Sequence, residues 1–299
     1  MNKWLEIKSL KEGIDACKKA SIPRYNDALS FDDPMQIYNY AVAYGSKFIT
    51  DEQLNILSSN AMYSAMYASR VLKGCFPQGE AAISRDTKAS FEYARDALKG
   101  RFLQGEAILS TCSHYAYRYA CEVLQDRFPE AERTISLNPQ YACLYAKHVL
   151  QDRWPEAEEK ISQNGCHSFD YALNVIKGRW EQGEKSIVKS PYYALHYAIQ
   201  IIKGRWAEGE KAISTDSEYV YKYANEVLKS RFPLGEDALL NNPRRLPSMV
   251  LDYTINVVKG RWIEGEKAFL PFRHLRERYE YFLQSKLDNL TKSEAVHPE

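Results

Sequence analysis

Two charged residues recur along this chain at a fixed spacing, and both could do chemistry. A glutamate returns every 26 residues, with one interval of 30, and an arginine stands five positions before it in seven of the eight copies. A row of guanidinium groups could bind phosphates or an acidic partner, and a row of carboxylates could supply acid–base pairs. The arginines are Arg101, Arg127, Arg153, Arg179, Arg205, Arg231 and Arg261, and the glutamates are Glu80, Glu106, Glu132, Glu158, Glu184, Glu210, Glu236 and Glu266.

The constant distance between arginine and glutamate favours a structural role. A residue that recurs in every copy needs an explanation that applies to every copy. Two opposite charges five residues apart, across the turn of a helical hairpin, can pair and cap helix ends. We therefore expect each Arg to bind a Glu within or between repeats. An arginine stripe that binds phosphates or an acidic protein is the alternative.

Tyrosine is the other repeated residue, with 22 in 299. One tyrosine holds the same place in each copy, and in five copies a second one precedes it by four residues, one helical turn away on the same face. Most of these rings are expected to pack between repeats; the alternative is an aromatic binding strip, with base stacking as its nucleic-acid form. The first set is Tyr67, Tyr93, Tyr119, Tyr145, Tyr171, Tyr197, Tyr223 and Tyr253, and the second is Tyr63, Tyr115, Tyr141, Tyr193 and Tyr219.

Other signals of catalysis or ligand binding are missing from the sequence. It contains no H-E-x-x-H, G-K-[ST] or G-x-S-x-G motif, its six histidines occupy different places in the repeat, and its six cysteines include no C-x-x-C pair. We predict no enzyme, no cofactor and no metal site. The cysteines are expected to be reduced thiols of an intracellular protein.

Composition bounds the kind of partner. The chain carries 40 basic and 39 acidic residues, so no net field attracts polyanions. No apolar run approaches the roughly 18 residues that a membrane span needs. We expect a cytoplasmic protein without a membrane partner.

Each 26-residue unit is predicted to form two helices. Apolar or small residues such as Ala194, Ala198 and Ile201 follow a helical period and predict helix A, which should end at a glycine in the left-handed conformation. An aromatic residue then fills the corner, and a proline often opens the short helix B. Ser, Asn, Thr or Asp follows helix B as the N-cap candidate of the next helix A. The expected fold is an all-α α-solenoid of about eight two-helix repeats, right-handed by analogy. The expected cap glycines are Gly74, Gly100, Gly178, Gly204 and Gly260.

The domain limits follow from where the repeat is regular. Residues 1–58 are expected to form an N-terminal helical cap with a degraded repeat, residues 59–270 the tandem hairpins, and residues 271–299 a capping helix and a frayed tail, TKSEAVHPE. Four extra residues in the segment NNPRRLPS lengthen the last connection between repeats. This segment carries Arg244 and Arg245, a possible specificity loop.

The frame Y-A-x-x-V-L-K-G-R-[FW]-P-x-G-E-x-A-I resembles the short tandem helical repeats of proteins from large tailed bacteriophages, and more distantly repeats of giant viruses. The resemblance covers residues 59–270 and implies a viral protein acting in the host cytoplasm. It brings no activity and no functional residues with it. Departures from the frame are Cys75 in place of Arg, and Leu103, Glu181, Ala207 and Ile263 in place of Pro.

The function we expect is a non-enzymatic protein-binding scaffold that binds and inhibits or redirects a host or defence protein. One alternative is a nucleic-acid or nucleotide binder that uses the arginine row, and another is a structural or assembly component. The candidate partner-binding residues come from the central copies and are Tyr141, Tyr145, Arg153, Arg179, Tyr193, Tyr197 and Arg205.

Overall fold

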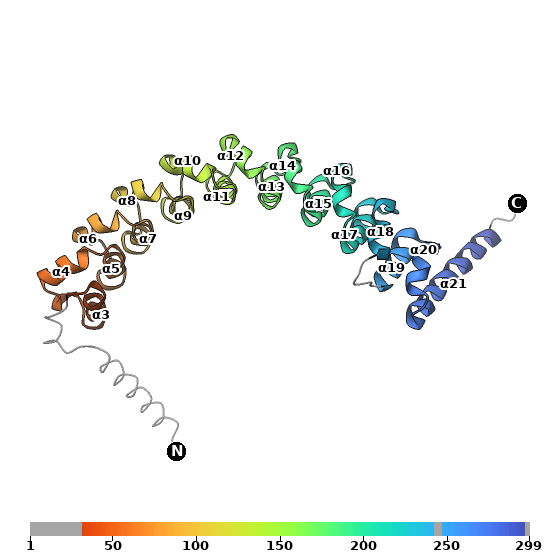
Figure 1. The fold of residues 1–299 in the computed structure, drawn as a ribbon, viewed down its shortest axis with the longest axis horizontal. Helices are drawn as coiled ribbons and strands as arrows, with labels where there is room; N and C mark the ends of the chain where they lie inside the picture. Colours follow the sequence, from red (N-terminus) through yellow and green to blue (C-terminus); the bar gives the residue numbers. More distant parts are fainter. Residues whose placement is uncertain (1–31, 242–246, 297–299) are drawn as a thin grey trace, which may run out of the picture. The chain divides into compact units, whose positions relative to one another are not determined.

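The described part of the chain is built from paired helices. The computed structural model describes residues 32–241 and 247–296, and within these ranges it contains helices and no strand (Figure 1). The expected all-α solenoid of helical-hairpin repeats is confirmed. In the same ranges, no helix combines the length and the apolar character needed to cross a membrane.

Each helix A is an α-helix that continues into a π-helical segment. The α-helical parts are α5 (Ala61–Tyr67), α7 (Thr87–Glu92), α9 (Ser113–Arg118), α11 (Pro139–Tyr145), α13 (Gly165–Tyr171), α15 (Pro191–Tyr197), α17 (Ser217–Lys222) and α19 (Pro247–Tyr253). The π-helical parts are η2 (Ala68–Leu72), η3 (Tyr93–Leu98), η4 (Tyr119–Leu124), η5 (Ala146–Leu150), η6 (Ala172–Ile176), η7 (Ala198–Ile202), η8 (Tyr223–Leu228) and η9 (Thr254–Val258).

Each helix B is short, and further helices flank the repeats. The B helices are α6 (Pro77–Ile83), α8 (Leu103–Leu109), α10 (Pro129–Ser136), α12 (Pro155–Ile161), α14 (Glu181–Ile187), α16 (Ala207–Ile213), α18 (Pro233–Asn241) and α20 (Ile263–Phe269). The flanking elements are α3 (Pro34–Tyr44), the 3₁₀ turn η1 (Ser46–Phe48), α4 (Asp51–Ser58) and α21 (Arg273–Val296).

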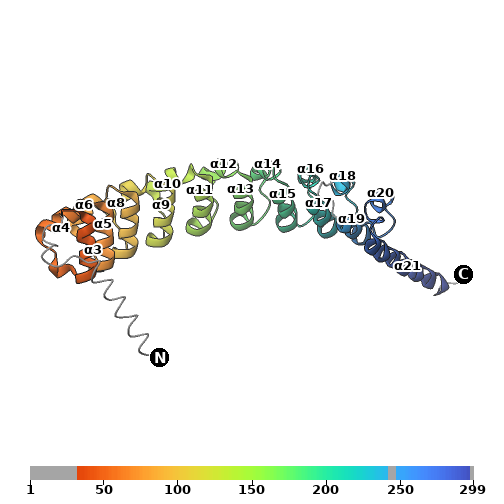
Figure 2. The same cartoon turned by 60° about the horizontal axis from the view of Figure 1, so that its bottom comes forward.

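The chain divides into two compact units, Met1–Gln151 and Asp152–Glu299. In the first unit, α5, α7, α9 and α11 lie side by side in one row, and α6, α8 and α10 lie in a second row (Figures 1 and 2). In the second unit, α13, α15, α17 and α19 form the corresponding row of A helices, and α14, α16, α18 and α20 the row of B helices. We call these the A row and the B row of each unit.

Local sequence explains where the helices begin. Asp86 caps α7 by accepting a hydrogen bond from the backbone N–H of Ala89 at 2.7 Å, and Asn60 caps α5 in the same way through Tyr63 at 3.0 Å. Proline occupies the first turn of several B helices, for example Pro77 in α6, where its missing N–H costs no hydrogen bond. The expected N-caps and helix B prolines are confirmed at these positions.

Helix A ends differently from our expectation. The residue in the left-handed conformation is the Lys or Gln one position before the expected cap, which is Gly in five copies and Asp or Ser in the other three, as in Lys203 with φ 55°. The carbonyl of Ala198 accepts from the N–H of both Lys203 and Gly204, which closes the wide π turn. The prediction of glycine caps was therefore wrong by one residue. The left-handed residues are Lys73, Lys99, Gln125, Gln151, Lys177, Lys203, Lys229 and Lys259.

A small residue inside helix B is required by the aromatic corner residue. The Trp206 ring folds back over the first turn of α16, and a Cβ on Gly209 would lie 2.4 Å from that ring. The ring also packs on Tyr197, with centroids 4.7 Å apart, and Trp206 is buried. The expected filling of the corner is confirmed, and it explains why Gly or Ala follows the aromatic residue by three positions.

The interior between neighbouring hairpins contains the residues that the helical pattern predicted. Ala194 on α15 and Ala198 on η7 are fully buried, as is Ile213 on α16. Small residues four apart let neighbouring A helices approach closely. The core is thus a line of alanines, aromatic rings and branched side chains that continues through each unit.

The described residues before the first full repeat form one more hairpin, α3 and α4. Tyr40 of α3 is buried like the repeated tyrosines. The capping box at the start of α4 joins Thr50 and Gln53 by hydrogen bonds in both directions. Residues 1–31 of the expected N-terminal cap lie outside the described residues.

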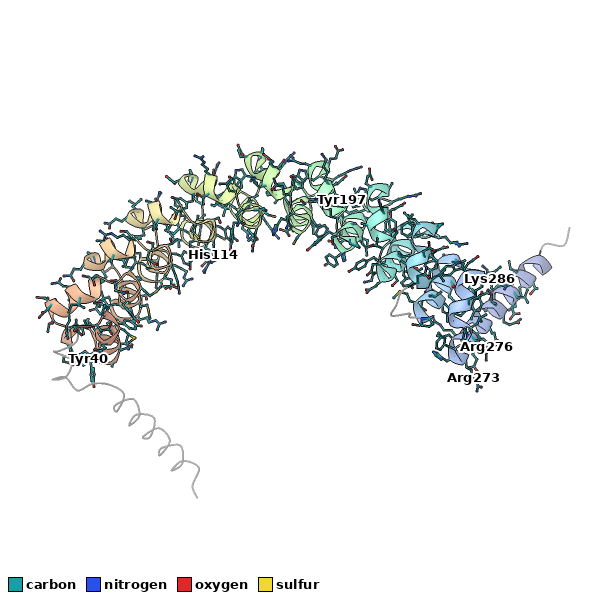
Figure 3. All side chains as sticks on the ribbon, in the orientation of Figure 1. Tyr40, His114, Tyr197, Arg273, Arg276 and Lys286 are labelled. Carbon is teal, nitrogen blue, oxygen red and sulfur yellow. The ribbon has the colours of Figure 1, made fainter. Side chains whose placement is uncertain are left out.

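The C-terminal helix α21 begins as a ninth helix A. Tyr279 follows Tyr253 by 26 residues and is buried in the same manner. The positions three before and one after this tyrosine, which hold small or apolar buried residues in the other copies, are occupied by the exposed Arg276 and Glu280. These charged side chains make this face of α21 unlike the stacking faces of the other A helices (Arg276 is labelled in Figure 3). The helix runs through Val296, so the first six residues of the expected frayed tail are helical.

The cap geometry predicts different effects on the free energy of unfolding at two adjacent residues. Lys203→Gly removes the cost of a side chain in the left-handed conformation and should raise the free energy of unfolding by about 1 kcal/mol. Gly204→Ala should be neutral, because no atom lies within 4 Å of the added Cβ. Urea denaturation followed by circular dichroism measures both. A destabilised Gly204→Ala variant would restore the glycine-cap prediction.

Candidate functional site

One contact repeats at the junction between successive hairpins. The hydroxyl of Tyr197 donates to Oε1 of Glu184 at 2.9 Å and accepts from the backbone N–H of Trp180 at 2.8 Å. Arg179 donates from Nε and Nη2 to the two oxygens of Glu184 at 2.8 and 3.0 Å. The tyrosine of one repeat is thereby hydrogen-bonded to the turn between the two helices of the preceding repeat. We call this arrangement the Tyr–Glu–Arg contact.

The hydroxyl-to-carboxylate bond of this contact occurs eight times among the described residues. Distances between the Tyr hydroxyl and Glu Oε1 lie between 2.8 and 3.2 Å. The predicted pairing of Arg with the Glu five residues later is confirmed in seven copies. The tyrosine–glutamate pairs are Tyr93–Glu80, Tyr119–Glu106, Tyr145–Glu132, Tyr171–Glu158, Tyr197–Glu184, Tyr223–Glu210, Tyr253–Glu236 and Tyr279–Glu266.

The electrostatics of this contact keep its groups in one protonation state. Burial, followed by the nearby Glu210 carboxylate, raises the pKa of Tyr223 to about 12. The hydrogen bonds from Arg127 hold the pKa of Glu132 below its ordinary value. At neutral pH the tyrosine is therefore a hydroxyl donor, and the glutamate is an ionised acceptor shared by Tyr and Arg.

Two of the predicted partner-binding residues are part of this interior contact. Tyr145 and Tyr197 are fully buried, and their hydroxyls bind Glu132 and Glu184. Neither ring reaches the surface, so the prediction that these two tyrosines contact a partner is corrected. Their role is to join repeats.

The predicted arginines lie at the surface with their charge already paired. Arg205 is the most exposed of the three, with 69% of its side chain accessible, and it holds Glu210 by two bonds of 2.7 and 3.2 Å. Arg153 binds Glu158 in the same way, and Arg179 binds Glu184. Arg179 also has Glu208 of the next repeat at 3.5 Å. The row therefore alternates in sign, which weakens any attraction for phosphates.

The remaining predicted residues separate into two groups. Tyr141 and Tyr193 are half-buried on α11 and α15, so part of each ring faces solvent. Arg244 and Arg245, the possible specificity loop, lie outside the described residues.

In the first unit, Tyr141 belongs to a group of rings on the A row. Its ring stacks on His114 of α9 with centroids 5.4 Å apart, and it lies 6.0 Å from the ring of Tyr117 (His114 is labelled in Figure 3). The hydroxyl of Tyr117 hydrogen-bonds to Nδ1 of His148 at 2.7 Å. We call His114, Tyr115, Tyr117, Tyr141 and His148 the first aromatic strip.

In the second unit, Tyr193 belongs to a similar group. Its ring lies 5.9 Å from Phe169 of α13 and 5.1 Å from Tyr192, which in turn lies 6.3 Å from Tyr219 of α17. His196 packs on Tyr192 at 4.4 Å, and burial and the nearby Lys222 lower its pKa, so it is neutral at pH 7. We call Phe169, Tyr192, Tyr193, His196 and Tyr219 the second aromatic strip.

Sequence reasoning identified only part of these strips. The tyrosines four residues before the repeated tyrosine were considered, but Tyr117, Tyr192 and the histidines were not grouped with them. The signal that could have found them is helical spacing: His114 and Tyr117 are three residues apart, and Tyr192 and His196 are four apart, so each pair shares one face of helix A.

The described residues contain few features that could bind a metal or a small ligand. They contain no group of three or more His, Cys, Asp and Glu side chains that could hold a metal ion. A shallow hollow of about 460 Å³ lies between η9 and α21, lined in part by Asn256, Phe282 and Asn289. Lys286 also lines it and donates to the carbonyl of Lys259, so it caps the end of η9.

No protein-family model, curated protein or solved structure matches the chain. Without such a match, a function can be argued only from the structure, and the two aromatic strips are the surface that supports this argument.

The first repeat provides a natural test of the ion pair. Glu80 accepts from Tyr93, but Cys75 stands where the other repeats have Arg. Cys75→Arg should raise the free energy of unfolding by about 0.5 kcal/mol, the usual size for a partly exposed pair. Cys75→Lys is the control and should gain less, because an ammonium cannot form two parallel bonds. Urea denaturation of both variants measures the difference, and equal gains would argue against bidentate pairing.

The buried tyrosines predict a two-phase alkaline titration. A pKa raised in the folded state contributes stability that is complete below the ordinary value near 10 and is lost as pH rises through the folded value, about 12 for Tyr223. Any tyrosinate that forms at lower pH should appear without loss of helicity. The repeated tyrosines should ionise together with unfolding, as followed by tyrosinate absorbance and circular dichroism. A single phase near pH 10 with helicity retained would contradict the buried contact.

Proposed function

We propose that the chain is a non-enzymatic protein-binding scaffold whose A row carries the binding surface. The observation that supports this proposal is the presence of the two aromatic strips. Their rings are partly exposed, and they lie side by side on neighbouring helices of a regular array. Tyrosine is among the residues that contribute most to binding energy at protein interfaces, and repeat arrays present such residues in rows.

Charge supports a protein partner over a polyanion. The segment that forms α15 and η7, residues 191–202, contains no Asp, Glu, Lys or Arg. Arg118 and Glu122, next to the first strip, bind each other at 2.6 Å. A surface without net charge gives no long-range attraction for phosphates. The repeated arginines are paired with glutamates, so the arginine row on which the nucleic-acid alternative depends is already neutralised.

An assembly role through end-to-end stacking is disfavoured at the C-terminal end. The charged Arg276 and Glu280 of α21 occupy the places where internal repeats have small or apolar buried residues. Burying these two side chains against another chain would cost more than it gains unless each found a partner.

The biological context of the proposal rests on the resemblance of the repeat to bacteriophage repeats. On this basis the partner is a host or defence protein that the scaffold inhibits or redirects. Such an activity needs a specific surface and no catalytic groups.

Capture of a partner from bacterial host lysate tests the proposal. The tagged chain should retain a stoichiometric protein after nuclease treatment, identified by mass spectrometry. A variant with Tyr117→Ala, Tyr141→Ala, Tyr192→Ala and Tyr219→Ala should lose that protein, since each large ring at an interface contributes on the order of 1 kcal/mol or more.

The matched control is Tyr281→Ala on α21, whose ring is 79% exposed and lies outside both strips. This variant should capture the partner as the unchanged chain does. Circular dichroism must show equal helicity for all three proteins. Retention of the partner by the four-tyrosine variant, or loss of the captured material with nuclease, would contradict the proposal.

A further inference from the structure

The second aromatic strip repeats along the array at a spacing that matches one kind of peptide. Its rings come from three successive A helices: Phe169 from α13, Tyr192 and Tyr193 from α15, and Tyr219 from α17. Neighbouring packed helices lie about 8 to 10 Å apart. A polyproline II helix rises about 3.1 Å per residue with about three residues per turn, so it repeats every 9 Å or so. One turn of such a peptide therefore spans one repeat of the array.

The rings also form a continuous path rather than isolated contacts. Consecutive ring centroids from Phe169 through Tyr193 and Tyr192 to Tyr219 are 5.9, 5.1 and 6.3 Å apart. Two of these pairs, Tyr192–Tyr193 and Tyr192–Tyr219, are edge to face. Edge-to-face rings leave flat faces turned in different directions, which suits proline rings that project from different sides of a left-handed helix.

Charge and hydrogen bonding favour the same occupant. The middle of the strip, residues 191–202, bears no charged side chain, and His196 is neutral at pH 7 because burial and Lys222 lower its pKa. On α17, Lys222 binds Glu218 at 2.7 Å. Along α15 and η7 a charged peptide would lose hydration without gaining a counter-charge, since the charged groups that act on His196, Lys222 and Glu226, belong to the next helix A. A proline peptide carries no charge that must be desolvated. Its carbonyls make no internal hydrogen bonds and can accept from tyrosine hydroxyls at the strip.

We propose that the second aromatic strip binds a proline-rich segment of a partner protein in the polyproline II conformation, one turn per repeat along α13, α15 and α17. This inference rests on the proposed scaffold function and specifies the chemistry of its partner. The first strip is less suited to a proline ligand, since Arg95 and Arg118 approach the Phe91 ring beside it to 4.9 and 4.4 Å and place charge there.

Fluorescence anisotropy with labelled oligoproline and the full chain tests the inference. A nine-proline peptide, about three turns long, should bind saturably and with the same affinity at low and high salt. A three-proline peptide, about one turn long, should bind at least about tenfold more weakly because it meets one repeat. A nine-residue Gly-Ser peptide should not bind, because it lacks both the rings and the preformed helix.

Variants of the chain distinguish specific binding at the second aromatic strip from non-specific binding elsewhere. Tyr192→Ala with Tyr219→Ala should weaken binding of the nine-proline peptide at least about tenfold with helicity unchanged, and Tyr281→Ala should leave it unchanged. The inference is overturned if the nine-proline peptide does not bind, if the Gly-Ser peptide binds equally well, or if the double variant binds as tightly as the unchanged chain. If these results occur while a lysate protein is still captured through the strips, the scaffold function stands and the peptide class is wrong.

Discussion

The architecture depends on a hydroxyl that reaches from one repeat into the turn of the repeat before it. In the second unit, Tyr197 satisfies a backbone N–H that the loop at Trp180 would otherwise bury without a partner, and it shares Glu184 with Arg179. An unmade hydrogen bond in such a place costs about 1 to 3 kcal/mol. Each junction is therefore specified by polar geometry as well as by apolar burial. Since every repeat bonds mainly to its neighbours, stability accumulates junction by junction.

The same contact decides which residues remain for binding. It uses the repeated tyrosines, the glutamates and two nitrogens of each arginine, so the most regular features of the sequence belong to the interior or are neutralised at its edge. The features available to a partner are the less regular ones, such as Tyr117, Tyr192 and His196. In this chain the residues that recur from copy to copy build the scaffold, and residues that differ between copies form the surface available to a partner.

Much of the fold could be predicted from sequence because the period is explicit. The helix pairs, the N-caps, the corner aromatics and the Arg–Glu pairs all followed from spacing and residue type. Spacing could not separate Tyr193 from Tyr197, because both lie on one face of helix A; the contact with the preceding turn decides which ring is buried. It also placed the left-handed residue at Gly204 instead of Lys203, because an ordinary α-helical end was assumed where the structure has a π turn. Tyr279 was missed because α21 lacks the alanine that follows the tyrosine in seven of the other eight copies and has no Lys-Gly step.

The four extra residues before α19 show where this architecture is permissive. The backbone N–H of Phe232 still reaches the hydroxyl of Tyr253 at 2.8 Å, although 21 residues separate them instead of the usual 17. Phe232 and Tyr253 flank the connection from helix B to the next helix A in sequence, and their hydrogen bond forms although this connection is four residues longer. Foreign peptides grafted at these connections would be displayed at regular intervals on an unchanged frame. The chain thus contains a series of equivalent insertion points, one for each junction.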